Sequence, residues 1–476
     1  MLGLTFEHRG NAAKVSPLSA CRKMYGLNVK RMKKITYKGM RKMNNKATKV
    51  RYGVVFMLFI TVIVNYMDRS NISIAAPFIT KELGIDSVTM GLIFSAFGWT
   101  YCALQIPGGW VLDKLGNRNT HAIGIAGFSI MTLLQGFASG FSGMFLLRVG
   151  LGVFEAPAFP TNSKVAASWF PENERARAIS IYTSGQFIGL AFLTPTLIFL
   201  QQSFGWRGLF IIAGIVGLAW SVLWYIFYRD PNKSNKVNQA ELDYIREGDG
   251  FIEASEKGEK VKIGAKDFRI ILSSRKLWGI FIGQFAVSST LWFFLTWFPT
   301  YLVEYRGLSF IKTGFLSSLP FLAAFVGVLS AGFLSDFLVK KGVSKDKARK
   351  APIITGLLLS TSIIGANYVD SPGLIVMFMS IAFFGNGFAS ITWVFVSLLA
   401  PKRLIGIAGG VFNFIGGTAS IIIPIVIGFL VKGGNFAPAL TFIACVTLTG
   451  ALSYIFLVGK VERVKEPIDQ LGKVAS

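Results

Sequence analysis

Four charged residues stand inside long apolar segments of this 476-residue chain: Asp68, Arg69, Arg148 and Glu155. If those segments cross a membrane, each charge costs roughly 2.5–3.5 kcal/mol, and four unpaired charges cost on the order of 10 kcal/mol. That total is comparable to the stability of a whole domain, which is about 5–15 kcal/mol. We therefore expect the four side chains to face one another or a hydrated cavity.

The spacing of these residues supports one shared site. Arg148 and Glu155 are seven positions apart, close to two helical turns, so both side chains lie on one face of a helix. Asp68 and Arg69 are adjacent, so one can face a cavity while the other faces a neighbouring helix.

Two arginines and two carboxylates together predict anion binding coupled to proton exchange. A guanidinium binds a carboxylate through two parallel hydrogen bonds. The acidic side chains cannot bind the same anion, but a buried carboxyl group takes up a proton and releases it when an arginine approaches. The residues thus indicate proton-coupled movement of a small organic anion. The alternative is two buried ion pairs that only fix helix packing, which apolar residues would do at lower cost.

Polar and aromatic side chains on other apolar segments could hold the rest of such a ligand. Hydroxyl, amide and indole groups suit a polyhydroxylated molecule. The candidates are Tyr66, Tyr101, Gln186, Ser390, Thr392, Trp393 and Asn413. Each of them could instead be an ordinary contact between two helices.

Apolar segments of about 20 residues must position these side chains, because a stretch of that length crosses a bilayer as a helix. Charged residues make up 15% of the chain, whereas soluble proteins average about 25%. We predict an all-α membrane protein with twelve spans: 52–78, 88–112, 119–138, 143–163, 178–200, 207–228, 277–302, 313–337, 352–368, 373–396, 405–430 and 436–459.

The basic residues predict the orientation. Of the 49 Lys and Arg residues, 42 fall in segments on one side of the predicted membrane, and five fall on the other. Positive charge stays cytoplasmic, so we expect both termini and the central linker inside the cell. Attraction to lipid headgroups explains the basic N-terminus, which has no apolar stretch for a secretory signal, and we expect no nucleic-acid partner. Met43 is a second possible natural start, so residues 1–42 should be dispensable for transport.

The chain divides into a basic N-terminal segment (1–50), a six-helix bundle (51–228), a charged cytoplasmic linker (229–276), a second six-helix bundle (277–459) and a cytoplasmic tail (460–476). The two bundles repeat each other, since Gln186-Phe-Ile-Gly189 recurs as Asn413-Phe-Ile-Gly416. Such repeats place the substrate site between the halves at mid-membrane.

Other function classes lack their motifs. The three Cys and two His residues form no metal-binding cluster, and no phosphate-binding loop or nucleophile motif occurs. We therefore expect neither an enzyme nor a resident metal or cofactor, with protons as the coupling ion.

The stretch Gly109-Trp-Val-Leu-Asp113-Lys-Leu-Gly116-Asn-Arg118 resembles the helix 2–3 signature of the major facilitator superfamily. The resemblance implies that Asp113 and Arg118 are cytoplasmic-gate residues. Asp336 is the counterpart of Asp113 in the second half, with a looser match to the signature. Residues 50–460 resemble the anion:cation symporters of that superfamily, through segments 65–71, 148–161, 182–195 and 403–416. The closest likeness is to bacterial sugar-acid carriers, D-galactonate transporters first and glucarate or hexuronate carriers next.

This resemblance implies roles for the residues above. Asp68 and Glu155 would be the proton-titrating carboxylates, Arg148 would hold the substrate carboxylate, and Arg69 would couple protonation to anion binding. The seven polar and aromatic candidates would contact hydroxyls or the carboxylate. We expect a monomeric importer of the bacterial inner membrane. Transport of glucarate, a hexuronate or another organic anion, efflux antiport on the same fold, and a non-transporting nutrient sensor stay open as alternatives.

Overall fold

The computed structural model describes residues 47–248, 250 and 264–464. Regular secondary structure in these residues is helical throughout, and ten helices are long and apolar enough to cross a membrane. The predicted basic segment lies outside the described residues except for positions 47–50, as does the tail beyond residue 464.

The helices form two sets with short helices between them. The first set is α3 (Val50–Leu83), α4 (Ser87–Gln135), α5 (Phe141–Glu155), α6 (Ala158–Trp169) and α7 (Glu172–Phe227). Within the linker lie η1 (Pro231–Lys233), α8 (Gln239–Glu247) and α9 (Ala265–Leu272). The second set is α10 (Arg275–Thr296), α11 (Phe298–Thr300), η2 (Tyr301–Tyr305), α12 (Phe310–Lys340), α13 (Lys345–Ser360), η3 (Thr361–Tyr368), α14 (Pro372–Ala389), η4 (Ser390–Thr392), α15 (Trp393–Leu399), η5 (Lys402–Leu404), α16 (Ile405–Leu430) and α17 (Ala437–Phe456).

Two of the long helices turn at a glycine. Gly116 in α4 has φ 74° and ψ 168°, and Gly205 in α7 has φ 68° and ψ 175°. Positive φ strains a residue that carries a Cβ atom, so glycine is favoured at both positions. The sequence predicts a loop at each of them. Each long helix is therefore two arms joined at a glycine.

Two predicted spans are less regular than expected. The span 352–368 is α-helical only to Ser360 and continues as the 3₁₀-helix η3, and the span 373–396 is interrupted by η4. The Ser360 hydroxyl donates to Gly356 O in its own helix and to Ala382 O in α14, both at 3.0 Å. Such bonds to the preceding turn compete with the helical pattern and bend the helix.

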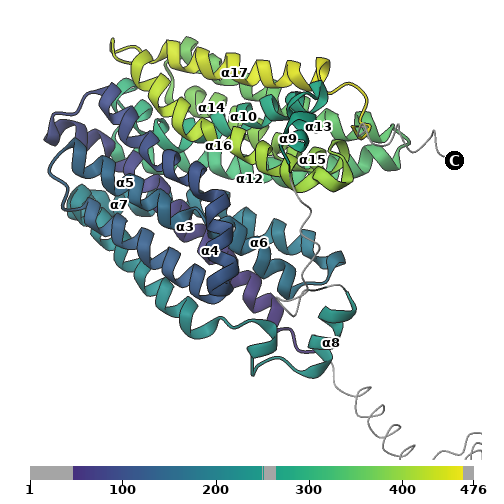
Figure 1. Cartoon of the computed structure of the whole chain (residues 1–476). Coiled ribbons are helices and arrows are strands. Elements are labelled where there is room, and N and C mark those ends of the chain that lie inside the picture. Colours follow the sequence, from purple (N-terminus) through teal and green to yellow (C-terminus); the bar gives the residue numbers. More distant parts are fainter. Residues whose placement is uncertain (1–46, 249, 251–263, 465–476) are drawn as a thin grey trace, which may run out of the picture.

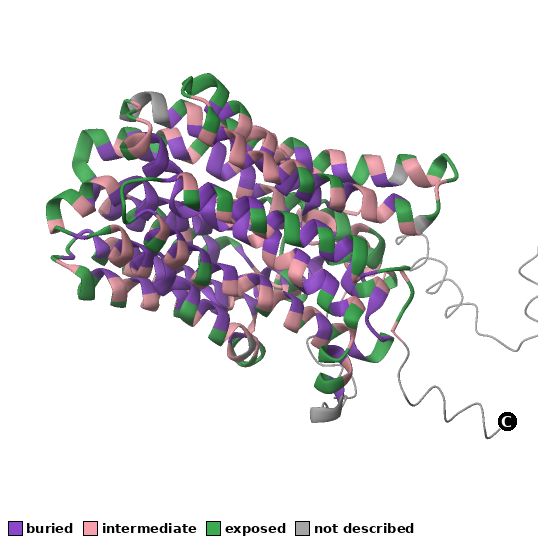
Figure 2. Ribbon diagram, turned by 90° about the horizontal axis from the view of Figure 1, so that it is seen from above, coloured by how far each residue is buried: buried purple, intermediate pink, exposed green. Residues whose placement is uncertain are grey.

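The two sets pack as two bundles, with the helices before residue 249 on one side and those after residue 263 on the other (Figure 1). Buried residues run through the interior of both, as the ribbon colours of Figure 2 show. The bundles contact each other mainly where α4 packs on α16 and α7 packs on α12. The central face between the bundles is where the candidate residues of both halves can meet.

Contacts between the bundles close the end that lies away from α8. The Ser87 hydroxyl of α4 donates to Gly428 O of α16 at 3.1 Å, and the Phe94 ring of α4 contacts the Trp297 ring with centroids 5.2 Å apart. A Cβ atom on Gly91 would come within 2.6 Å of Pro424 O, so α4 and α16 approach closely only because this residue is glycine. A small residue on α4 therefore allows the two bundles to close against each other at this end.

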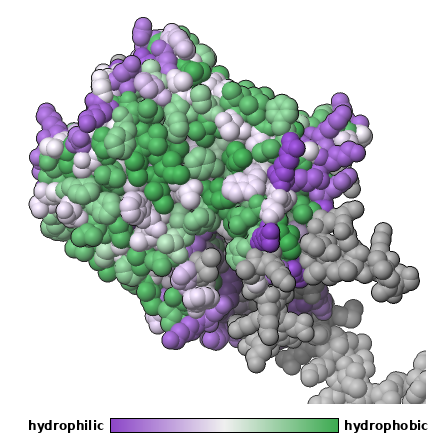
Figure 3. Space-filling model, turned by 45° about the horizontal axis from the view of Figure 1, so that its top comes forward, coloured by the Kyte–Doolittle hydropathy of each residue, from purple (hydrophilic) through white to green (hydrophobic). Residues whose placement is uncertain are grey.

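The outer surface is apolar in a broad band. Figure 3 shows this band between hydrophilic ends. Phe192 and Phe333 are 70% and 77% exposed. A surface in contact with water seldom gathers large apolar side chains that are this exposed. The band is suited to contact with lipid hydrocarbon, as a multi-pass membrane protein requires.

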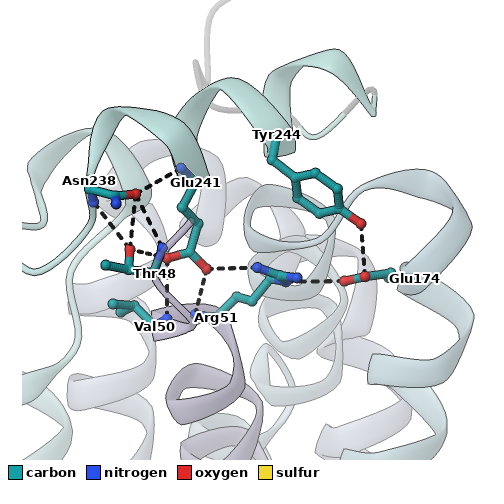
Figure 4. A network of polar contacts seen from close by, with 7 residues as sticks. All are labelled: Thr48, Val50, Arg51, Glu174, Asn238, Glu241 and Tyr244. Atoms are coloured by element: carbon teal, nitrogen blue, oxygen red, sulfur yellow. Dashed lines mark hydrogen bonds and ion pairs between the residues drawn. The ribbon is translucent and has the colours of Figure 1, made fainter. Parts of the chain in front are cut away.

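The linker carries structure that the sequence analysis did not predict (Figure 4). The Glu241 carboxylate of α8 is fully buried against the start of α3. It accepts hydrogen bonds from Thr48 Oγ1 at 2.6 Å and from Val50 N at 3.2 Å, and it pairs with Arg51 Nη1 at 3.0 Å. Arg51 also pairs with Glu174 Oε2 at 3.1 Å. The helix α8 is thus fastened to the N-terminal bundle.

The other end of the linker is fastened to the C-terminal bundle. Asp267 in α9 pairs with Arg403 Nη2 at 2.5 Å and accepts a hydrogen bond from Gly264 N at 2.9 Å. The Arg403 guanidinium and that amide hold the pKa of the Asp267 carboxyl below its usual value. Each bundle therefore holds one helix of the linker.

Replacing Glu241 by alanine should destabilise the protein, because it leaves the Arg51 guanidinium buried without one of its two counter-charges. Breaking a buried ion pair costs about 3–5 kcal/mol, and we expect a lower midpoint of thermal unfolding in detergent, followed by tryptophan fluorescence. Glu247→Ala removes an exposed carboxylate from the same helix and is the matched control. Equal midpoints for the two variants would show that the contacts of Figure 4 contribute no stability.

Candidate functional site

Arg69 and Glu155 form a buried ion pair in the N-terminal bundle. Arg69 Nη2 lies 2.7 Å from Glu155 Oε1, and Arg69 Nε donates to the same oxygen at 2.8 Å. The packing of α4 on α5 brings Glu155, the last residue of α5, to this position. Gly152 allows that packing, since a Cβ atom there would overlap the backbone of α4 near Tyr101. The predicted partnership of a carboxylate and an arginine is therefore present.

Aromatic rings surround the Arg69 guanidinium. Its Cζ atom lies 4.9 Å from the ring centroids of Tyr66, Phe97 and Tyr101. Phe97 and Tyr101 stack at 5.0 Å, and Phe97 also contacts Trp292 of the opposite bundle at 5.8 Å. Cation–π contacts of this kind stabilise a desolvated arginine by about 0.5–2 kcal/mol each. The ion pair thus lies beside the interface between the bundles.

Arg148 and Asp68 lie deeper in the same bundle, and both are fully buried. Arg148 Nη1 donates to the backbone oxygen of Asp68 at 3.4 Å, a long contact. Its Nε and Nη2 atoms have no hydrogen-bond partner among the described residues, nor does either carboxylate oxygen of Asp68. Arg148 also lies 5.7 Å from the Phe97 ring, which Arg69 shares. All four charges therefore gather around one region, but only Arg69 and Glu155 form a direct ion pair.

The predicted amide and hydroxyl groups form hydrogen bonds within and between the bundles. The Tyr66 hydroxyl donates to Gln186 Oε1 at 2.7 Å. The Thr392 hydroxyl donates to the side chain of Gln284 at 2.8 Å. Asn413 of α16 donates to the side chain of Gln105 on α4, which joins the two bundles. These groups can exchange their mutual bonds for bonds to a ligand.

A depression of about 440 Å³ lies beside this last contact, lined by Trp393, Val396, Ser397, Ile405, Gly406, Gly409, Gly410 and Asn413. Trp393 is 49% exposed, and its ring contacts the Phe412 ring edge to face, with the centroids 4.9 Å apart. Ser390, one turn earlier, is half-buried, whereas Thr392 is buried. The expected cluster of Ser390, Thr392 and Trp393 is thus spread over different environments.

Two of the predicted gate residues, Asp113 and Arg118, bind within their own bundle. Asp113 pairs with Lys164 Nζ of α6 at 2.7 Å. Arg118 donates from Nε and Nη2 to Tyr225 O of α7, at 2.9 and 2.7 Å. Asp336 lies in α12, and its side chain is outside the part that the structure describes. Asp113 and Arg118 therefore each have a partner in the N-terminal bundle.

Sequence reasoning missed Phe97, Gln105 and Gln284, which touch the predicted residues. Phe97, Tyr101 and Gln105 repeat every four positions and so share a helix face. That spacing was a signal from which the first two omissions could have been found. In the described part of the chain, no group of three or more His, Cys, Asp and Glu is placed to hold a metal ion.

Comparison of the sequence with known proteins identifies the family to which the chain is similar. Residues 58–424 match the model of the Major Facilitator Superfamily. The chain is 54% identical over 417 residues to a D-galactonate transporter of Escherichia coli, covering 87% of this chain and 97% of that one. It is 44% identical to a probable galactarate/D-glucarate transporter of Bacillus subtilis, covering 88% and 94%.

Solved structures agree on the fold. A crystal structure of a D-xylose–proton symporter has a TM-score of 0.65 at 14% identity, covering 86% of this chain and 98% of that one. A bacterial homologue of the lysosomal transporter Spinster, in an inward-facing and unoccupied conformation, has a TM-score of 0.63 at 18% identity, covering 87% and 96%. The match of the family model and of these relatives leads to one conclusion: the chain belongs to the Major Facilitator Superfamily.

Proposed function

We propose that this protein imports a sugar acid, D-galactonate, together with protons across the bacterial inner membrane. The observation that carries the proposal is the buried group of Arg69, Glu155, Arg148 and Asp68, found in a chain 54% identical to a D-galactonate transporter. The arginines would bind the anion and the carboxylates would carry the protons. Two carboxylates allow more than one proton for each anion.

Alternating access would expose this group to one side of the membrane at a time. The different surroundings of the two ends of α16 support this part of the proposal. Its outer part, at Ser420 and Gly428, packs on α4. Its other part, at Gly406 and Gly410, lines the open depression. The chain would then be open toward the side of α8, with the opposite side closed.

The proposed topology has twelve spans in two bundles of six, counting the arms of α4 and of α7 separately. Both termini and the linker would be cytoplasmic, as the excess of basic residues on that side requires. In this orientation Asp113 and Arg118 are at the cytoplasmic end, where they would contact the other bundle when the carrier opens outward. We propose that the monomer is the transporting unit, since each chain contains both halves of the site.

Uptake into right-side-out membrane vesicles tests the function. Making the external medium acid should drive accumulation of labelled D-galactonate, and a protonophore should abolish it. Competition by unlabelled galactonate, gluconate, glucarate and galacturonate then ranks the substrates, and we expect galactonate to compete best.

Other results would point to other functions. Accumulation only in inside-out vesicles would indicate efflux antiport. Binding of galactonate without counterflow would indicate a nutrient sensor. Strong competition by glucarate with none by galactonate would reassign the substrate to the relatives that are 44% identical.

A further inference from the structure

Two rows of buried polar side chains face each other inside the N-terminal bundle, behind the ion pair. On α3 the row is Asn65, Asp68 and Asn71, three residues apart and each fully buried. This spacing places them on one face of the helix. The amide atoms of both asparagines and both oxygens of Asp68 have no hydrogen-bond partner among the described residues.

The second row lies on the arm of α4 that follows Gly116. It consists of Ser129, Thr132 and Gln135, again three residues apart and fully buried. The Ser129 and Thr132 hydroxyls and Gln135 Oε1 are without a partner in the described part of the chain. Gln135 Nε2 makes one long bond to Met131 O, at 3.4 Å.

The rows belong to helices that run in the same direction, since one complete helix arm separates them in the chain. The Thr132 hydroxyl lies beside the Asp68 carboxyl, although without a hydrogen bond of normal geometry. The second arm of α7 covers the rows. Gly217 packs on the Ser129 side chain, with Val64 of α3 close by.

The two ends of the rows differ. Toward α8, the face of α3 continues with Leu58 and with Thr61, whose hydroxyl donates to Met57 O at 2.9 Å and accepts from the Trp220 indole at 3.0 Å. The face of α4 continues with the buried apolar residue Ile125. Toward the other end, Gln135 is the last residue of α4. Thr132 is three residues from that helix end, or about 5 Å at 1.5 Å per residue. On α3 the face continues outward with the buried apolar residues Ile74, Ala75 and Ile79. The rows are therefore closed toward the cytoplasmic side, and toward the outer surface they end on the α4 side alone.

Polar atoms in such numbers are seldom left without partners in a protein interior. Burying one amide or hydroxyl without a hydrogen bond costs about 1–3 kcal/mol. Buried groups of this kind are normally satisfied by ordered water, which needs two to four polar partners. Asp68 and Thr132 supply such partners at one level, and Asn71 and Gln135 follow them on the same two helices.

We propose that the two rows enclose a file of water molecules that conducts protons between the outer surface and the Asp68 carboxyl, separately from the route of the sugar acid. The inference rests on the proposed proton coupling and adds a path to it. The acid–base step is balanced: an O–H bond of a hydronium ion in the file breaks, an O–H bond forms on the Asp68 carboxylate, and neutral water remains. Arg148 and Glu155 are the other charged groups that face Asp68, and both belong to α5.

Filling the file with apolar atoms tests the path. Asn71→Leu and Gln135→Met keep side-chain volume but displace water, whereas Asn71→Ala and Gln135→Ala leave more room for it. We expect the initial rate of proton-driven uptake to fall about tenfold or more in the Leu and Met variants, because a positioned proton donor typically contributes a factor of about 10²–10⁴. The Ala variants should keep most of the wild-type rate. A role in packing alone predicts the reverse order, since Ala leaves the larger cavity.

A further measurement separates the outcomes. Exchange of labelled for unlabelled sugar acid at equal pH should be preserved in every variant, which shows that each one folds and cycles. Wild-type rates in Asn71→Leu and Gln135→Met, beside loss of coupling in Asp68→Asn, would overturn the water file. If the rate of uptake by the wild-type protein does not depend on the pH gradient, the proposed function itself is overturned.

Discussion

Replacing Glu155 by glutamine will abolish proton-driven accumulation of the sugar acid while sugar-acid exchange across the membrane continues. Glutamine keeps the shape of the side chain and an acceptor for Arg69 Nε, which lies 2.8 Å from the carboxylate. It cannot take up or release a proton, so the Arg69 guanidinium has the same neutral partner in every step of the cycle. Transport is then passive.

Accumulation ratios measure this effect directly. One pH unit can drive about a tenfold accumulation for each proton that is coupled, because 1.4 kcal/mol is a factor of ten. We expect the ratio in Glu155→Gln to fall to the value set by the membrane potential alone. Glu304→Gln, which changes an exposed carboxyl in η2 far along the chain from the ion pair, is the matched control. Accumulation at the wild-type ratio in Glu155→Gln would remove this residue from the coupling role.

The sequence located the charged group because charge inside apolar segments is conspicuous. Asp68 and Arg69 were expected to face different ways, and they do. The side chain of Arg69 lies among aromatic rings, and that of Asp68 lies between α3 and α4. Which residue faces which way could not be predicted, because it depends on how α4 packs around α3.

Contacts between the bundles lay beyond sequence reasoning for a similar reason. Asn413 was predicted as a binding residue, but its partner Gln105 is 308 positions away. No local pattern specifies such a pair, since it depends on the crossing of α4 and α16.

The contact of the linker with the N-terminal bundle, by contrast, has a local signal in the sequence. Asn238 accepts a hydrogen bond from Glu241 N at 2.9 Å, which makes it the N-cap of α8. An asparagine followed three residues later by glutamate is typical of a helix start. The burial of Glu241 against Arg51 was not predictable, because the positions are 190 residues apart.

Replacing Arg148 by alanine will weaken sugar-acid binding by about a hundredfold or more, the second large effect that we expect. Arg69 is engaged by Glu155, whereas Arg148 keeps two nitrogen atoms without partners in the described part of the chain. A substrate carboxylate could bind both of them. Losing a buried charge-assisted pair costs about 2–5 kcal/mol, and each 1.4 kcal/mol is about tenfold in affinity.

Equilibrium binding of labelled galactonate to the purified protein in detergent measures this loss, with thermal unfolding as the check that each variant folds. Arg148→Lys is the informative control, because it keeps the positive charge beside Asp68 but loses the planar pair of donors. Its affinity should fall between those of Arg148→Ala and the wild type. If Arg148→Lys binds as tightly as the wild type, the site needs only a charge and the two-bond geometry is wrong. If Arg148→Ala also binds normally, the carboxylate is held elsewhere, and Arg69 must leave Glu155 to bind it.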